Sequence, residues 1–190
     1  MNFENTALVL IDLQKGIANM GETAPHSVDT VIDNASKMVK LFKNNNGFVA
    51  FVRVKFLDGK DALQPNAMRP LPGGTKPPAE FSEIVDQLGA GPDDYIIDKR
   101  GFSGFFGTDL DLQLRRRGIK NIVIGGISTH IGVDTTARDA YQYGYDQYFI
   151  SDMMSAPEAS LHHYSIENTF PIMGQVLTTD EMMAQLQSEK

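Results

Sequence analysis

The sequence predicts an α/β fold of three layers, in which helices cover both faces of a parallel central sheet. Short apolar segments alternate with amphipathic segments of helical period along the chain. The apolar segments show no polar alternation, which is typical of strands buried on both faces. No repeat or linker interrupts this order. Because alternating strands and helices form parallel sheets with right-handed connections, we expect a single domain over residues 1–190.

The first strand and the first helix are expected before Gly47. Residues 6–12, TALVLID, form an apolar run that ends in a carboxylate. Ser27 can cap the helix that follows, and Gly47 ends it. The apolar residues of this helix lie on one face: Val28, Val31, Ile32, Ala35, Met38, Val39 and Phe42.

A second strand, FVAFVRVKF (48–56), leads into a long segment without a periodic pattern. Residues 57–78 of this segment contain five prolines. A loop of this length in a compact domain is more often a lid or a binding segment than a spacer. We expect a short helix over 81–88 after the loop, and a third strand, DYIIDK, over 94–99.

The second half continues the alternation of strands and helices. Thr108 caps one helix, and Gly118 stops it after Arg117. The other elements expected here are strands over 121–126, 145–151 and 175–179, and helices over 132–143, over 156–168 and from Thr179.

Composition excludes several classes of function. The net charge of −7 argues against a nucleic-acid partner, and the apolar runs are too short to span a membrane. The N-terminus lacks the pattern of a signal peptide, so we expect a cytoplasmic protein that acts on a small molecule. The chain contains no cysteine, which excludes disulfides, zinc bound by cysteine and a thiol nucleophile.

Three chemically distinctive segments follow strands that should end at one edge of the sheet. Asp12 closes the first strand, Lys99 closes the third, and the turn GGISTHIG (125–132) closes the fourth. Taken alone, each charged residue could be a cap or a solvated strand end. Ligands of parallel sheets bind beyond the carboxyl ends of the strands, so the coincidence favours a site. Gly132 would start a helix, where a ligand oxygen can approach backbone N–H groups.

Four segments of the chain resemble the isochorismatase-like (cysteine hydrolase) superfamily. They are LVLIDLQKG, DKRGFSGFFGTDLDLQLRRRGI, IVIGGISTHIGVDTTARDAYQYGY and ENTFPIMGQVLTTDEMM. The resemblance implies a Rossmann-like fold and an Asp–Lys–Cys site that hydrolyses amides. Asp12 and Lys99 match the first two positions, and Gly132 stands where the cysteine would be. The resemblance also places a cis peptide bond between Ile127 and Ser128.

The sequence His130-Ile131-Gly132 resembles the branch of true isochorismatases, which lack the cysteine. That branch hydrolyses a vinyl ether through protonation of a carbon and attack by water, with the Asp as acid and the Lys holding charge. The branch has a tyrosine at the position of Ser128. The substrate-binding residues expected here are Ile127, Ser128, Phe102 and Phe106, with Gln64 and Arg69 as candidates from the loop.

Several alternatives stay open. Ser128 is disfavoured as a nucleophile because GISTH lacks the second glycine of the G-x-S-x-G turn. A catalytically inactive family member that binds a metabolite or a partner protein is the second hypothesis, and an amidase with a displaced nucleophile is the third. Burial would raise the pKa of Asp12 and Lys99 would lower it, so Asp12 is either an acid or a base.

Metals, cofactors and assembly are predicted mainly from the resemblance. The segment after the second strand lacks the histidine of the metal-binding nicotinamidases, so we expect no metal, and we expect no other cofactor. His162 and His163 are adjacent and make a poor metal pair, and His130 is interpreted as structural. The family resemblance implies a homodimer or a homotetramer.

Overall fold

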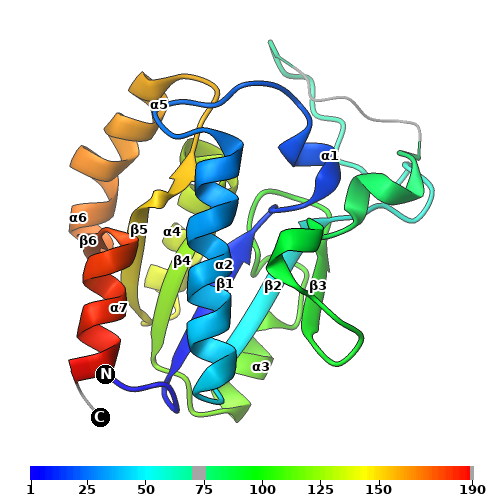
Figure 1. Ribbon diagram of the computed structural model, residues 1–190. Coiled ribbons are helices and arrows are strands. Elements are labelled where there is room, and N and C mark those ends of the chain that lie inside the picture. Colours follow the sequence, from blue (N-terminus) through cyan, green and yellow to red (C-terminus); the bar gives the residue numbers. More distant parts are fainter. Residues whose placement is uncertain (70–75, 189–190) are drawn as a thin grey trace.

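The computed structural model describes residues 1–69 and 76–188. In this part of the chain, six parallel strands form one sheet in the order β3-β2-β1-β4-β5-β6 (Figure 1). This order confirms the predicted parallel α/β fold and is that of Rossmann-like sheets. The strands are β1 (Thr6–Ile11), β2 (Phe48–Val54), β3 (Tyr95–Lys99), β4 (Asn121–Ile127), β5 (Asp146–Ser155) and β6 (Gln175–Leu177).

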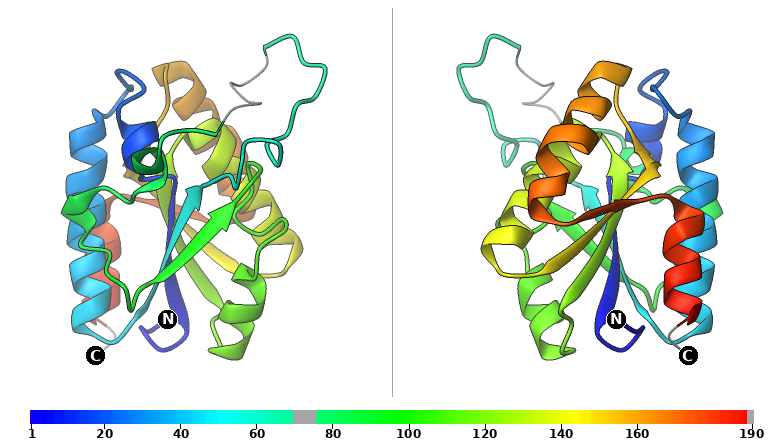
Figure 2. Two further views of the ribbon diagram at one scale, coloured as in Figure 1. Left: turned by 90° about the vertical axis from the view of Figure 1, so that its right-hand side faces the viewer. Right: turned by 90° about the vertical axis from the view of Figure 1, so that its left-hand side faces the viewer.

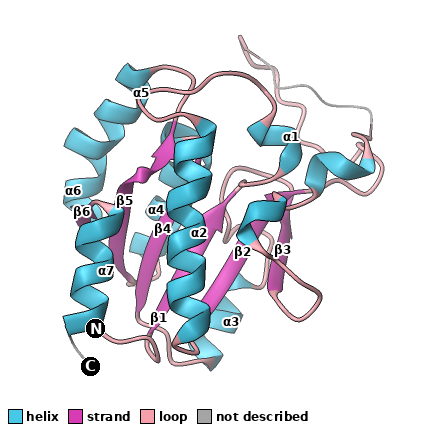
Figure 3. Cartoon of the chain, in the orientation of Figure 1, coloured by secondary structure: helices cyan, strands magenta, loops and turns pink. Residues whose placement is uncertain are grey.

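Helices cover both faces of the sheet (Figure 3). α2 and α7 pack on one face, and α3 and α4 pack on the other. The helices are α1 (Lys15–Ala18), α2 (Val28–Asn44), α3 (Leu110–Arg116), α4 (Asp134–Gln142), α5 (Ala159–Tyr164), α6 (Phe170–Met173) and α7 (Thr179–Ser188). Shorter turns are η1 (Ala79–Ser82) and η2 (Asp86–Leu88), which are 3₁₀-helical, and η3 (Thr129–Val133) and η4 (Ser165–Thr169), which are π-helical.

β1 lies in the middle of the sheet and is buried along its whole length. Leu8 and Leu10 join the apolar core beneath α2, whereas Val9 and Ile11 join the core beneath α3 and α4. Successive strand residues point to opposite faces, so a strand covered on both sides must be apolar throughout. This requirement explains the unbroken run that ends at Asp12.

The predicted caps of two helices are present. The Ser27 hydroxyl accepts a hydrogen bond of 3.1 Å from the Thr30 amide at the start of α2. The Thr108 hydroxyl accepts one of 3.3 Å from the Leu110 amide, although the residue that directly precedes α3 is Asp109. Both bonds satisfy amides that have no partner within the helix.

Four predicted elements differ in detail from the structure. The helix expected over 81–88 is two 3₁₀ turns, because the backbone between them pairs with the segment after β1: Lys15 N donates to Glu83 O (2.8 Å) and Val85 N donates to Leu13 O (3.2 Å). β5 runs to Ser155 instead of residue 151, because its last residues pair with the end of β4. The helix expected over 132–143 begins as the π-helical turn η3, and the one expected over 156–168 divides into α5 and η4.

Residues 57–69 of the long proline-rich segment stand away from the body of the molecule, at the end of the sheet where the strands have their carboxyl termini (Figure 2). Its residues 57–69 and 76–78 carry no helix or strand, as expected from the sequence. Residues 70–75 of this predicted loop lie outside the described residues. None of the described helices is long and apolar enough to cross a membrane.

Candidate active site

The three predicted strand ends converge at the carboxyl edge of the sheet. Asp12 directly follows β1 with φ of 56°, in the left-handed region that few residues other than glycine adopt. Its amide donates a hydrogen bond of 2.8 Å to the Val52 carbonyl of β2. The backbone of Asp12 therefore stays attached to the sheet, although its conformation is no longer that of a strand. A strained backbone of this kind is typical of functional sites.

Asp12 and Lys99 form a buried ion pair. The Lys99 ammonium nitrogen lies 2.9 Å from Oδ2 of Asp12, and the two side chains are 1% and 8% exposed. The ammonium also donates to the carbonyls of Gly101 and Phe102, both at 3.0 Å. These three contacts use all three of its hydrogens. Lys99 therefore pairs with the Asp12 carboxylate, and its ammonium has no hydrogen left to donate to another ligand.

The second carboxyl oxygen of Asp12, Oδ1, is buried and makes no hydrogen bond with the part of the chain that the structure describes. Burial raises the pKa of Asp12 to about 6, against the opposing effect of the Lys99 charge. Burial thus outweighs the ion pair. The carboxyl group can hold a proton close to neutral pH, and Oδ1 is free to pass it on.

Gly132 brings the backbone against this carboxyl group. A Cβ atom at this position would lie 3.0 Å from Oδ2 of Asp12 and 3.0 Å from the Ile11 side chain. In η3 the Val133 amide donates to the Ser128 carbonyl at 3.3 Å, which closes the wide turn that contains Gly132. The peptide bond between Ile127 and Ser128 is cis, where the family resemblance placed it.

A second glycine lets β1 and β4 approach beneath the site. Gly126 has φ of 138°, and a Cβ atom there would lie 2.0 Å from the Ile11 carbonyl oxygen. No other residue fits this position without separating the strands. The pair of glycines at the end of β4 is the sequence signal for this approach.

The predicted substrate-binding residues divide into two groups. Ser128 directly precedes the turn that contains Gly132, and the Phe102 carbonyl contacts Lys99. Ile127 is the last residue of β4, and its side chain is 4% exposed and belongs to the apolar core beneath α2. The Phe102 side chain is 48% exposed and that of Phe106 is 78% exposed, so both can meet a ligand from solution. Gln64 and Arg69 are exposed on the loop, and within the described residues neither contacts the ion pair.

Gln14 supports the site and was missed by the sequence analysis. It is completely buried, and its side-chain amide donates to the carbonyls of Val54 (3.0 Å) and Phe81 (2.8 Å). Its oxygen accepts a bond of 2.6 Å from the Val54 amide. Gln14 thereby joins the ends of β1 and β2 to the segment that returns from the long loop. A polar residue two positions after Asp12 was the available signal.

His162 supports the turn from the other side. Its Nδ1 shares a hydrogen bond of 2.9 Å with the Thr129 hydroxyl, and both residues are buried. Burial lowers the pKa of His162 to about 4, with the neighbouring His26 and His163 adding to the effect. His162 is therefore neutral at physiological pH. In residues 1–69 and 76–188, no group of three or more His, Asp or Glu side chains is arranged to hold a metal ion, and the absence of a metal stays a prediction.

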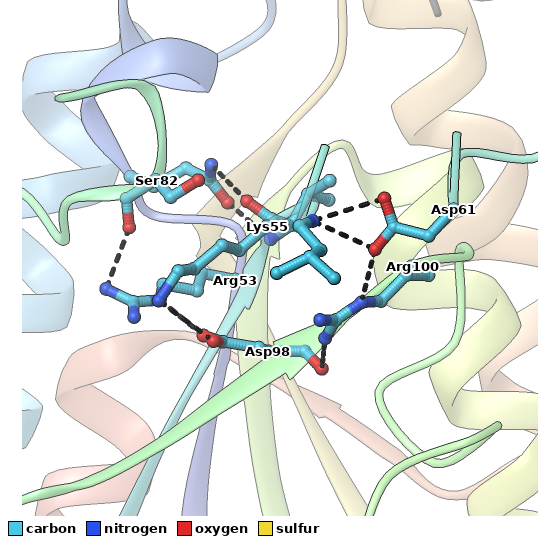
Figure 4. Close-up of polar contacts among 9 residues, drawn as sticks. Arg53, Lys55, Asp61, Ser82, Asp98 and Arg100 are labelled. Carbon is cyan, nitrogen blue, oxygen red and sulfur yellow. Dashed lines mark hydrogen bonds and ion pairs between the residues drawn. The ribbon is translucent and has the colours of Figure 1, made fainter. Parts of the chain in front are cut away.

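Ion pairs at the carboxyl ends of β2 and β3 hold both ends of the long loop (Figure 4). The Asp98 carboxylate forms ion pairs with Arg53 at 2.7 Å and with Lys55 at 3.2 Å. Arg100 joins the Asp98 carbonyl, at 2.9 Å, to the Asp61 carboxylate, at 3.2 Å, near the start of the loop. Arg53 also donates to the carbonyl of Ser82, after the loop, at 3.0 Å. The sequence did not indicate this anchoring.

The buried Asp12–Lys99 pair at the carboxyl edge of a Rossmann-like sheet is the arrangement that a resemblance to hydrolases of the isochorismatase type implies. The model of the isochorismatase domain matches residues 6–181. The chain belongs to the isochorismatase family, as the resemblance predicted.

Relatives of similar length support this assignment. The uncharacterized isochorismatase family protein YwoC of Bacillus subtilis is 46% identical over 187 residues, which cover 98% of this chain and 96% of YwoC. The corresponding protein YecD of Escherichia coli O157:H7 is 39% identical, with 96% and 97% covered. The structure of an isochorismatase family protein from Burkholderia thailandensis has a TM-score of 0.92 at 36% identity, with 97% and 96% covered. Other matching members are named as amidohydrolases and amidases.

Proposed function

We propose that the protein hydrolyses a small metabolite at a vinyl-ether or related bond, without a thiol nucleophile, and that Asp12 is the acid. The observation that carries this proposal is the unpartnered Oδ1 of Asp12 on a carboxyl group whose pKa is raised to about 6. A buried carboxyl with this pKa can donate a proton near neutral pH. Gly132 leaves no nucleophile beside it, so water has to supply the oxygen.

The proposed reaction has three steps. Asp12 first gives its proton from Oδ1 to the terminal carbon of the enol ether, and the carbon that bears the ether oxygen becomes positively charged. Water then adds to that carbon and returns a proton to Asp12. In the third step the bond between this carbon and the ether oxygen of the hemiketal breaks, and the hemiketal hydroxyl proton passes to the departing oxygen, which yields a carbonyl compound and an alcohol.

The other site residues have supporting roles in this proposal. Lys99 stabilises the Asp12 carboxylate that forms when the proton leaves, since its ammonium contacts Oδ2. The backbone around Ile127, Ser128 and Gly132 would hold a substrate oxygen, and the side chains of Phe102 and Phe106 would contact the substrate. Gln64 and Arg69, which are exposed on the loop, would be further candidates for contacting it. We further propose a cytoplasmic homodimer or homotetramer.

A turnover screen of the wild-type protein beside Asp12→Asn tests the proposal. The panel contains isochorismate, simpler vinyl ethers, small amides and ureidoacrylate, because a relative in Variovorax paradoxus that is 25% identical is named ureidoacrylate amidohydrolase. We expect turnover of a vinyl ether that falls by about 10²–10⁴-fold in Asp12→Asn, the usual contribution of general acid catalysis.

Two results would contradict the proposal. Turnover of amides alone would mean that another group or an activated water replaces the cysteine. Binding of a panel member without turnover, unchanged in Asp12→Asn, would favour the inactive binding protein.

A further inference from the structure

Thr136, in the first turn of α4, joins the two backbone segments that surround the ion pair. Its side chain is completely buried. The hydroxyl donates to the Gly132 carbonyl at 2.6 Å and accepts from the Gly104 amide at 2.9 Å. A Cβ atom on Gly104 would lie 3.4 Å from the Thr136 methyl group, so the methyl packs closely against this loop. Both the hydroxyl and the methyl group of Thr136 therefore contact the surrounding backbone.

The loop 101–104 is the segment that holds Lys99. The carbonyls of Gly101 and Phe102 accept two of the three hydrogen bonds of its ammonium. The next two residues are attached to α4: the Ser103 hydroxyl donates to Asp139 at 2.5 Å, and the Gly104 amide donates to Thr136. The position of the Lys99 ammonium thus depends on side chains of α4.

Two paths lead from Thr136 to the Asp12 carboxyl group. One runs through Gly104 and its loop to Lys99, which contacts Oδ2. The other runs through Gly132, whose Cα lies so close that an added Cβ would be 3.0 Å from the same oxygen. Because both paths end at Oδ2, the Thr136 hydroxyl sets the spacing between the carboxyl, the ammonium and the turn.

We infer that Thr136 is a positioning residue for the Asp12–Lys99 pair, with Ser103 and Asp139 as a second attachment of the same loop. The inference rests on the proposed function in placing the reaction at this pair. Thr136 does not contact the reacting atoms. Without its hydroxyl, the Gly104 amide and the Gly132 carbonyl lose a partner in a buried site, and the loop that holds Lys99 is released on one side.

Three threonine variants test the inference. Thr136→Val keeps the shape and removes the hydroxyl, whereas Thr136→Ser keeps the hydroxyl. Thr135→Val is the matched control, because the same change lies one residue earlier and the Thr135 hydroxyl makes no hydrogen bond in the described part of the chain. The readout is the titration of the Asp12 carboxyl carbon by ¹³C NMR, with Asp12→Asn identifying the signal.

We expect Thr136→Val to raise the Asp12 midpoint by about half a pH unit or more, since Lys99 is the group that lowers it. Thr136→Ser and Thr135→Val should titrate like the wild type. With a turned-over substrate, Thr136→Val should lower kcat more than it changes KM. A folded Thr136→Val with a wild-type titration would overturn the inference.

Ser103→Ala serves if Thr136→Val does not fold. It removes the bond to Asp139, and we expect an upward shift of the same carboxyl; an unshifted midpoint would equally overturn the inference. The titration needs no substrate. A protein without turnover would therefore contradict the proposed function and leave this measurement decisive.

Discussion

The Lys99 ammonium lies 2.9 Å from the Asp12 carboxylate, and both side chains are almost completely buried. Burying two charges is costly, and the ion pair offsets the cost only while both partners and their hydrogen bonds are in place. The three hydrogen bonds of Lys99 meet this condition, but Oδ1 of Asp12 does not. In this ion pair the hydrogen-bonding groups of Lys99 are therefore satisfied, whereas those of Asp12 are satisfied only in part.

Lys99→Met should destabilise the protein in a manner that depends on pH. Removing one partner of a buried pair costs about 3–5 kcal/mol. Without Lys99 the pKa of Asp12 rises beyond about 6, further above the ordinary value of 3.8. A carboxyl whose pKa is higher in the folded state stabilises that state as the pH falls. Urea unfolding should show the full penalty at about pH 8 and a smaller one at about pH 5.

The exposed Lys120 provides the control for this experiment, since its side chain makes no hydrogen bond or ion pair in the described residues. Lys120→Met should change the free energy of unfolding by less than about 0.5 kcal/mol at either pH. A penalty of Lys99→Met that is the same at both pH values would mean that Asp12 does not take up the proton.

The pH dependence of turnover should show whether Asp12 acts as a general acid or as a general base. With a pKa of about 6, an acid loses its active form above that pH. We expect kcat/KM to fall about tenfold per pH unit above pH 6 and to level off below it. A rate that instead falls on the acid side would make Asp12 a base that activates water.

Gly132→Ala should impair the site more than it affects the fold. The added Cβ meets Asp12 Oδ2 and Ile11 at 3.0 Å, so the carboxyl has to move. We expect a loss of about 1–3 kcal/mol of stability and a large loss of turnover. The control is Gly91→Ala, where the added Cβ lies at an ordinary 3.8 Å from Asp94. Unchanged turnover in Gly132→Ala would mean that the site tolerates a side chain there.

The convergence of Asp12, Lys99 and the turn after β4 could be predicted from the sequence, because it follows from the shared direction of the parallel strands. Each residue follows an apolar strand, and the carboxyl ends of parallel strands meet at one edge. The cis peptide bond at Ser128 came from the family resemblance, and the structure has it. No property of the separate residues would have indicated it.

The supports of the site could not be predicted, because their contacts join residues far apart in the chain. Thr136 and Gly104 are separated by 32 positions, and Gln14 and Phe81 by 67. Thr136 lies in a helix where a threonine is unremarkable, and Gln14 resembles the polar end of a strand. Their roles depend on which backbone groups the fold leaves without a partner, and this is decided by the tertiary structure.

The glycine at position 132 also bears on how the site withstands oxidation. A low-pKa catalytic thiolate is readily converted to sulfenic acid and then to forms that are not restored. This site presents a carboxyl and an ammonium group, and the sequence contains no cysteine. Peroxide and thiol-alkylating reagents therefore have no thiolate to attack at this site, and the chemistry of the Asp12–Lys99 pair should persist under conditions that inactivate an enzyme with a catalytic thiol in its place.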